Sequence, residues 1–284
     1  MRDASVRVRG LNFHYVEWGA PQATTIVCLH GITQTAHSWD EVAEMLASDF
    51  HLLCFDQRGH GDSDWAPDHD YSRYAQAEDL AAITQALALP PFVLAGMSMG
   101  GINAITFTAR HPQQVRALIV VDVSPEIAQK GVENIRQFIQ QEDVLPDFEA
   151  FVARAHAFNP RRSLSNIRDR LRHNLKQLPD GRWTWKYDPY LRSPQRAFEA
   201  GALASLWEDV AAIRCPTLIV KGAESDILSP QAAARMQAAI AGAELAVIPG
   251  AGHSVMGDNP AAFVEATRAF LVRAGIERSA RPHQ

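Results

Sequence analysis

Short apolar runs alternate with amphipathic segments over most of the 284-residue chain. Six runs are rich in β-branched residues and nearly continuous in apolar character, which is typical of strands covered on both faces of a parallel sheet. They span residues 23–31, 51–59, 91–98, 117–124, 216–225 and 243–253. Helical periodicity separates them, over residues 39–47, 74–87, 101–110, 230–241 and 260–274. The alternation predicts βαβ crossovers and a doubly wound, mostly parallel sheet.

The N-terminal region has a different pattern. Between residues 6 and 19, the apolar residues Val6, Val8, Leu11 and Phe13 stand among polar ones. Such alternation indicates strands with one solvated face, so we expect an antiparallel hairpin at the edge of the sheet. With this hairpin the sheet has eight strands.

The middle of the chain breaks the alternation. Residues 125–212 show helical periodicity and turns but no convincing ladder of strands. The segment is too long for a loop, so we interpret it as a helical cap inserted between two strands of the sheet. The expected organisation is a core domain of residues 1–124 and 213–284 and a cap domain of residues 125–212.

The composition places the chain among ordinary globular proteins. It is 47% apolar and 21% charged, with a net charge of −5, which gives no indication of a nucleic-acid partner. No apolar run approaches the roughly 18 residues of a membrane span, and the N-terminus lacks the pattern of a signal peptide. Cys28, Cys54 and Cys215 lie in or beside strand-like runs without metal-binding spacing. We therefore expect a cytoplasmic protein with three reduced cysteines and no membrane partner, while its oligomeric state stays open.

The stretch "GMSMG" at residues 96–100 fits the pattern G-x-S-x-G of a nucleophile elbow. In that motif a serine occupies the tip of a tight turn from strand to helix, and the flanking glycines remove side chains that would clash. The alternative is a dinucleotide-binding loop, but Ser98 stands where such a loop needs its second glycine. The sequence therefore favours Ser98 as a nucleophile.

A serine nucleophile needs a base and a carboxylate that orients the base. His253 follows the last strand-like run within "GAGHS", and Asp226 follows the preceding run within "GAESD". Both lie at the carboxyl edge of the sheet, where ligands bind in open α/β folds. The predicted catalytic triad is Ser98, Asp226 and His253. Asp122 follows an earlier strand and remains the alternative acid.

Acyl transfer also needs two hydrogen-bond donors for the developing oxyanion. The backbone N–H of Met99, directly after the nucleophile, is one candidate. The loop after the run "TIVCLHGIT" offers the N–H of Ile32 as the other. We interpret His30 in the same loop as a structural brace, with a place in the substrate pocket as the alternative.

Five motifs together resemble the α/β-hydrolase fold superfamily over nearly the whole chain. They are "LHGIT", "FDQRGHGDSD", "GMSMGG", "GAESD" and "GAGHS". The chain is most similar to the esterase, lactonase and perhydrolase-like group that carries a helical cap. The resemblance implies that Asp56 and Arg58 brace a tight turn. His60 and Asp62 in the same stretch offer too few ligands for a metal site.

The resemblance implies a serine hydrolase that cleaves carboxylic esters of small molecules through an acyl-enzyme, with no cofactor and no metal. Ser98 at the elbow, instead of aspartate, makes epoxide hydrolase and dehalogenase activities improbable. Alternatives are a lactonase or perhydrolase, or an amidase acting on a carboxylated enamide, because the chain also resembles (acetamidomethylene)succinate hydrolases. A small-molecule receptor that keeps the triad is the non-enzymatic alternative.

The cap adds a local charge to this picture. Residues 151–200 hold 11 basic against 4 acidic residues. We expect the arginines of this region to lie on solvated helix faces, although an anion-binding pocket would also suit them. These arginines are Arg161, Arg162, Arg168, Arg170 and Arg172. Trp183 and Trp185 are expected to pin the cap to the core, with pocket lining as the alternative.

Overall fold

The computed structural model describes residues 1–126, 131, 133–134, 137, 141–160, 162–193 and 203–276. Eight strands form one sheet in the order β1-β2-β4-β3-β5-β6-β10-β11. β2 pairs antiparallel with β1 and β4, whereas the other neighbours are parallel. The strands are β1 (Arg2–Val8), β2 (Leu11–Trp18), β3 (Thr25–Leu29), β4 (His51–Phe55), β5 (Phe92–Met97), β6 (Val115–Val121), β10 (Thr217–Gly222) and β11 (Glu244–Ile248). The predicted eight-stranded, mostly parallel sheet and its edge hairpin are confirmed.

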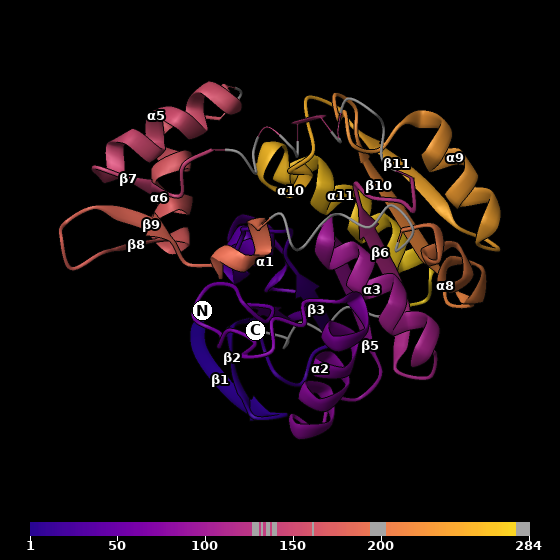
Figure 1. The fold of residues 1–284 in the computed structure, drawn as a ribbon. Helices are drawn as coiled ribbons and strands as arrows, with labels where there is room; N and C mark the ends of the chain where they lie inside the picture. Colours follow the sequence, from indigo (N-terminus) through magenta and orange to yellow (C-terminus); the bar gives the residue numbers. More distant parts are fainter. Residues whose placement is uncertain are drawn as a thin grey trace, which may run out of the picture.

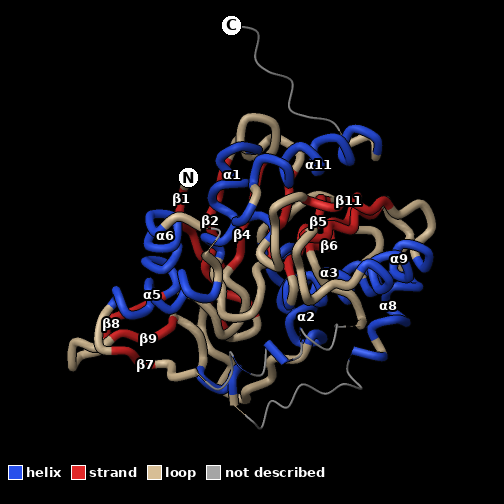
Figure 2. The backbone as a smooth tube through the Cα atoms, turned by 90° about the horizontal axis from the view of Figure 1, so that it is seen from above, coloured by secondary structure: helices blue, strands red, loops and turns tan. Residues whose placement is uncertain are grey.

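Helices cover both faces of this sheet, which makes it doubly wound (Figures 1 and 2). One apolar cluster packs side chains such as Trp39 and Phe263 against one face, and a second packs Leu80 and Phe107 against the other. On the first face lie η1 (Ala36–Trp39), α1 (Asp40–Leu46), α10 (Val255–Asp258) and α11 (Pro260–Arg273). On the second lie α2 (Arg73–Ala86), α3 (Met99–Arg110), α8 (Leu206–Ala212) and α9 (Pro230–Ala239). Within the described residues, none of the helices is both long and apolar enough to cross a bilayer.

The inserted segment is not purely helical, contrary to the expectation. It contains a second, three-stranded antiparallel sheet in the order β7-β9-β8. We use the term cap for residues 144–193, which gather at one side of the molecule in Figures 1 and 2. Its elements are β7 (Val144–Leu145), α5 (Phe148–Phe158), α6 (Leu164–Asn174), β8 (Leu175–Gln177), β9 (Trp183–Trp185) and η2 (Pro189–Arg192). These strands have only two or three residues, too few for an alternation that a sequence pattern reveals.

The last helix of the insertion packs with the core instead. Leu206 and Val210 of α8 are fully buried in the same apolar cluster as Phe107 of α3. The chain then enters β10, which pairs in parallel with β6. A parallel pair needs a crossover connection, and α8 supplies the helix of that crossover. Helix α8, which the expected domain division places in the cap, thus packs with the core.

Candidate active site

Ser98 is the first residue after β5 and the N-cap residue that directly precedes α3. Its φ of 53° lies in the left-handed region, which is strained for a residue with a side chain. The adjacent glycines make the bend possible: a Cβ on Gly96 would lie 2.2 Å from the carbonyl oxygen of Gly100. A Cβ on Gly101 would lie 2.6 Å from Cγ1 of Val123. The turn therefore has the backbone of a nucleophile elbow, with the serine half-buried at its tip.

Asp122 and His253 form a hydrogen-bonded pair beside this turn. Oδ2 of Asp122 lies 2.8 Å from Nδ1 of His253. The carboxylate is fully buried, and it also accepts hydrogen bonds from Gly222 N, at 3.0 Å, and from the Ser225 hydroxyl. Since an ionised carboxylate can only accept, Nδ1 of His253 carries the proton and Nε2 is left with its lone pair. This is the arrangement that prepares a histidine to act as a general base.

Asp226, the expected acid, does not reach His253. It is half-buried and accepts a hydrogen bond from the side-chain amide of Asn134 in the inserted segment. Asp122 takes its place for a geometric reason. It directly follows β6, just as Ser98 directly follows the neighbouring β5, and its φ of 52° gives it the same type of turn. Asp226 lies four residues beyond the end of β10, on the far side of Ser225.

The loop that carries His253 is held against the end of β10. Glu224 N donates to the carbonyl of Ala251 at 2.9 Å, and Gly252 N donates to Asp258 at 3.0 Å. The His253 side chain remains 30% exposed. Among the described residues there is no hydrogen bond between Ser98 Oγ and this ring, and in many enzymes that bond forms only when substrate is bound.

The loop after β3 lies against the nucleophile. A Cβ on Gly31 would come within 3.4 Å of Cβ of Ser98, and Gly100 N donates to the carbonyl of His30 at 3.1 Å. The N–H groups of Ile32 and Met99 have no acceptor within the part of the chain that the structure describes. The loop that contains Ile32 therefore lies against the turn that contains Ser98 and Met99.

His30 braces this loop and is fully buried. Its Nδ1 donates to the carbonyl of Gly31 at 2.7 Å, and its Nε2 accepts from Gln57 N at 3.0 Å. Burial lowers the pKa of His30, which keeps the ring neutral and its two hydrogen-bonding roles distinct. The Gln57 side chain bonds to the His30 carbonyl and receives a bond from Asn103. The geometry favours the structural role for His30 over a place in the substrate pocket.

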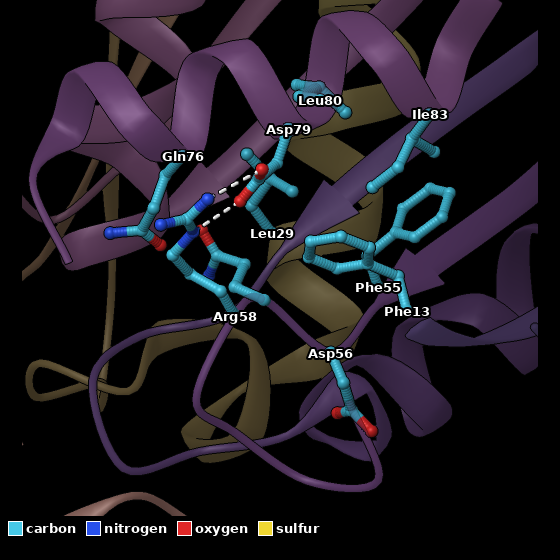
Figure 3. A pocket seen from close by; sticks show the side chains of 10 residues that line it. Phe13, Leu29, Phe55, Asp56, Arg58, Gln76, Asp79, Leu80 and Ile83 are labelled. Atoms are coloured by element: carbon cyan, nitrogen blue, oxygen red, sulfur yellow. Dashed lines mark hydrogen bonds and ion pairs between the residues drawn. The ribbon is translucent and has the colours of Figure 1, made fainter. Parts of the chain in front are cut away.

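The glycine-rich turn after β4 is also architectural. Figure 3 shows Arg58 directed at the carboxylate of Asp79, to which its Nη2 donates at 2.7 Å. Asp56 accepts hydrogen bonds from Ala36 N, Asp62 N and the His14 ring. A cavity of about 20 Å³ lies beside this ion pair, enough for a single water molecule. Its lining contains none of the three residues Ser98, Asp122 and His253, so it is separate from the candidate active site.

The two tryptophans of the cap pack within the cap. Trp183 makes an edge-to-face contact with Phe148, with ring centres 5.3 Å apart, and Trp185 makes one with Phe151 at 5.0 Å. Trp185 also stacks on Tyr187, whose backbone bridges to His60 in the core. Trp185 also packs on a cluster that joins Ala66 and Tyr71 of the core to Tyr187, as expected for a residue that pins the cap, whereas the ring contact of Trp183 is internal to the cap.

The cap arginines fall into two groups, with Arg161 outside the described residues. Arg168 and Arg172 form exposed ion pairs with Glu149 and Asp169, as expected for solvated helix faces. Arg162 and Arg170 instead turn toward α10, directly after His253: atoms of both would crowd a Cβ on Gly257. Arg162 bonds to Asp258 at 2.7 Å and to the carbonyl of Ser254 at 3.2 Å. Burial and the neighbouring Arg162 lower the pKa of Arg170 to about 9.

Comparisons with known proteins agree with this geometry. Residues 24–260 match the family model described as alpha/beta hydrolase fold. Esterase Rv0045c from Mycobacterium tuberculosis is 33% identical over 272 residues, covering 93% of this chain and 88% of that protein. Its crystal structure has a TM-score of 0.79 and 30% identity, and the match covers 95% of this chain and 91% of that one.

Two further relatives extend the range of activities. The 3-hydroxybutyrate-oligomer hydrolase of Cupriavidus necator is 31% identical, with 90% of this chain and 92% of that protein covered. The crystal structure of E-2-(acetamidomethylene)succinate hydrolase has a TM-score of 0.85 and 26% identity, covering 95% of this chain and all of that one.

Proposed function

The chain belongs to the alpha/beta hydrolase fold family, and on that premise we propose that it is a serine hydrolase of small carboxylic esters. Ser98 is the nucleophile, His253 the general base, and Asp122 the acid that orients it. The N–H groups of Met99 and Ile32 form the oxyanion hole. The reaction passes through an acyl-enzyme and requires no cofactor.

In the first step, His253 Nε2 takes the proton of the Ser98 hydroxyl as Oγ attacks the ester carbonyl. The carbonyl oxygen becomes an oxyanion, which the two backbone N–H groups stabilise. His253 then protonates the departing alcohol, leaving the acyl group on Oγ. In the second step a water molecule, deprotonated by His253, attacks the acyl carbon. The bond to Ser98 Oγ breaks, His253 returns the proton to Oγ, and the carboxylic acid leaves. Asp122 stabilises the imidazolium that forms in both steps.

The observation that carries this proposal is the pair formed by Asp122 and His253. The buried carboxylate accepts from the backbone and a hydroxyl as well as from the ring, so it is held in one orientation. A surface histidine without function would not need such a partner. The pair lies beside a serine whose strained turn is supported by close backbone contacts. Esterase relatives at about 30% identity support the choice of ester substrates.

The test is steady-state hydrolysis of short-chain p-nitrophenyl esters by the purified protein and by Ser98→Ala. We expect the variant to lose kcat by about 10⁴-fold or more while its thermal unfolding stays close to that of the parent. Turnover near the parent rate in the variant would contradict the role of Ser98. A parent that gives one burst of product and then stops would instead indicate a receptor that keeps the triad.

A second candidate substrate class follows from Arg162 and Arg170. Their guanidinium groups lie against residues 254–258, directly after His253. A carboxylated ester or enamide would place an anion near them, and one structural neighbour is named for hydrolysis of a substrate of that class. The experiment compares a neutral ester with its carboxylated analogue at low and high salt. A preference for the analogue that weakens as salt rises would favour the second candidate.

A further inference from the structure

Three potential metal ligands meet where the cap contacts the core. His37 belongs to η1, Asp40 begins α1, and His173 lies in the last turn of the cap helix α6. One ligand atom from each residue lies within 4.8 Å of the other two. Two imidazoles and one carboxylate are a donor set that suits zinc and its neighbours among the divalent transition metals.

The hydrogen bonds of this group leave ligand atoms free. Nδ1 of His37 lies 2.8 Å from Oδ2 of Asp40. The other oxygen, Oδ1 of Asp40, is buried and has no hydrogen-bond partner within the described part of the chain. The His173 ring likewise has no hydrogen-bond partner among the described residues, and it stacks on His37 with ring centres 3.6 Å apart. A buried acceptor without a donor destabilises the fold, and a bound cation would satisfy it.

A second group of similar composition consists of His14, Asp56 and Asp62. In this group the buried carboxylate has no oxygen left without a hydrogen-bond partner. Both oxygens of Asp56 are already used, by Ala36 N at 2.6 Å and by the His14 ring and Asp62 N. This carboxylate is therefore a structural acceptor. The comparison singles out the group at the cap, where Oδ1 of Asp40 and the His173 ring have no hydrogen-bond partner among the described residues.

We propose that His37, Asp40 and His173 bind a single divalent transition-metal ion of the zinc type and that this ion joins the cap to the core. The stacked rings separate as the ion binds, so that each directs a nitrogen lone pair to it, and a water molecule completes a four-coordinate site.

The position of His173 explains why the ion would act as a clamp. The adjacent Asn174 already accepts a hydrogen bond from Thr35 at 2.9 Å, which brings the end of α6 to η1. η1 follows the loop that carries Ile32. A coordinate bond from each side would therefore tie the cap to the segment next to the oxyanion loop. The C-terminal end of a helix also carries partial negative charge, which favours a cation.

The test uses the untagged, chelator-treated full-length protein and Zn²⁺ in isothermal titration calorimetry. We expect one ion per chain, and an affinity at least about 10-fold weaker in His173→Gln and in His37→Gln. His69→Gln is the matched control, because His69 is an exposed histidine that lies 3.4 Å from another carboxylate, that of Asp188. It should bind Zn²⁺ as the parent does. Thermal unfolding without zinc verifies that each variant is folded.

Hydrogen–deuterium exchange supplies a second measurement, independent of activity. Zinc should slow exchange in α6 and in η1 of the parent and leave both unchanged in His173→Gln. The proposal is overturned if His173→Gln binds zinc with the parent affinity. It is also overturned if binding is lost only when His253 is replaced, because the ion would then occupy the candidate active site.

Discussion

The core and the cap hold their polar residues by different means. In the core, Ser98 and Asp122 directly follow neighbouring strands, and close backbone contacts at Gly96 and Gly100 fix the turn that carries Ser98. In the cap, Arg168 and Arg172 are held by ion pairs whose members are all more than a third exposed. Exposed pairs of this kind contribute little to the free energy of unfolding, because solvent screens their attraction.

This difference between core and cap suits the two requirements of an enzyme, the placement of reacting atoms and the choice of substrate. Chemistry needs atoms placed to within a fraction of an ångström, and the core provides this through backbone geometry. On the proposed function, substrate choice falls to the cap, whose surface tolerates a change of charge at little cost in stability. Substitutions in the two regions should therefore differ in kind as well as in size.

The largest effect is expected from the two aspartates that compete for the role of acid. Asp122→Asn replaces the acceptor that fixes the His253 tautomer, so kcat on a p-nitrophenyl ester should fall about 10⁴-fold. Asp226→Asn alters a side chain that accepts a hydrogen bond from Asn134 of the inserted segment, so it should change kcat less than about 10-fold. The reverse order of effects would return the acid to Asp226.

A matched pair of glycines compares the two regions for stability. A Cβ on Gly100 would lie 2.4 Å from the carbonyl oxygen of Leu29 and 2.6 Å from that of His30, both backbone atoms. We expect Gly100→Ala to reduce the free energy of unfolding by about 3 kcal/mol or more. Gly181 of the cap has a φ of 89° but nothing within 4 Å of a Cβ, so Gly181→Ala should cost about 1–2 kcal/mol.

Urea unfolding measures both variants. Equal costs at the two glycines would show that the core turn yields to an added methyl group. The distinction between a core fixed by its backbone and a tolerant cap would then fail.

The smallest effect concerns pH. The hydrogen bond from His14 to Asp56 raises the pKa of His14 above its usual value, whereas the pKa of Asp56 is lowered. The contribution of His14 to the free energy of unfolding is therefore complete below the pKa of the unfolded state, near 6.5. It is lost as the pH rises through the raised pKa of the folded state. It should amount to about 1 kcal/mol. That of Asp56 is lost only at acidic pH, as pH falls through its lowered value.

The measurement is the difference in unfolding free energy between the parent and His14→Gln from about pH 6 to pH 9. Glutamine keeps a hydrogen-bond donor but does not titrate in this range. We expect the parent's advantage to shrink as pH rises. A difference that stays constant with pH would mean that the pair carries no linked proton.

The sequence predicted the core well because its signals are local. The β-branched runs and the glycines around Ser98 each specify backbone within a few residues, and the structure has the strands and the turn where the pattern indicated. The acid was harder to assign. Asp122 and Asp226 both follow strands that pair with each other, and the sequence does not show which carboxylate reaches the His253 loop. The difference that separates the two aspartates is their distance from the end of the preceding strand. Asp122 lies one residue beyond its strand and Asp226 lies four residues beyond its strand.

The cap could be predicted only as an insertion. Its strands are too short to show a period, and its ion pairs join residues that no sequence rule connects. The ligand group shows the same limit: His37 and His173 lie 136 positions apart and meet only because α6 packs on η1. Sequence spacing therefore predicted no metal site. Ser225, whose hydroxyl donates to Asp122, was likewise missed, because its role depends on the neighbouring strand.

The pairing of β6 with β10 has a consequence for how this protein could change over time. The two strands are hydrogen-bonded neighbours, and α8 packs against the sheet directly before β10. The cap is therefore an insertion between two strands that already pair in the sheet. The entropic cost of closing a loop grows only with the logarithm of its length. Doubling the length of such an insertion therefore reduces the free energy of unfolding by roughly 0.6 kcal/mol. Caps could be lengthened, shortened or exchanged at this joint, and a lineage could acquire new substrates there while the catalytic edge stays as it is.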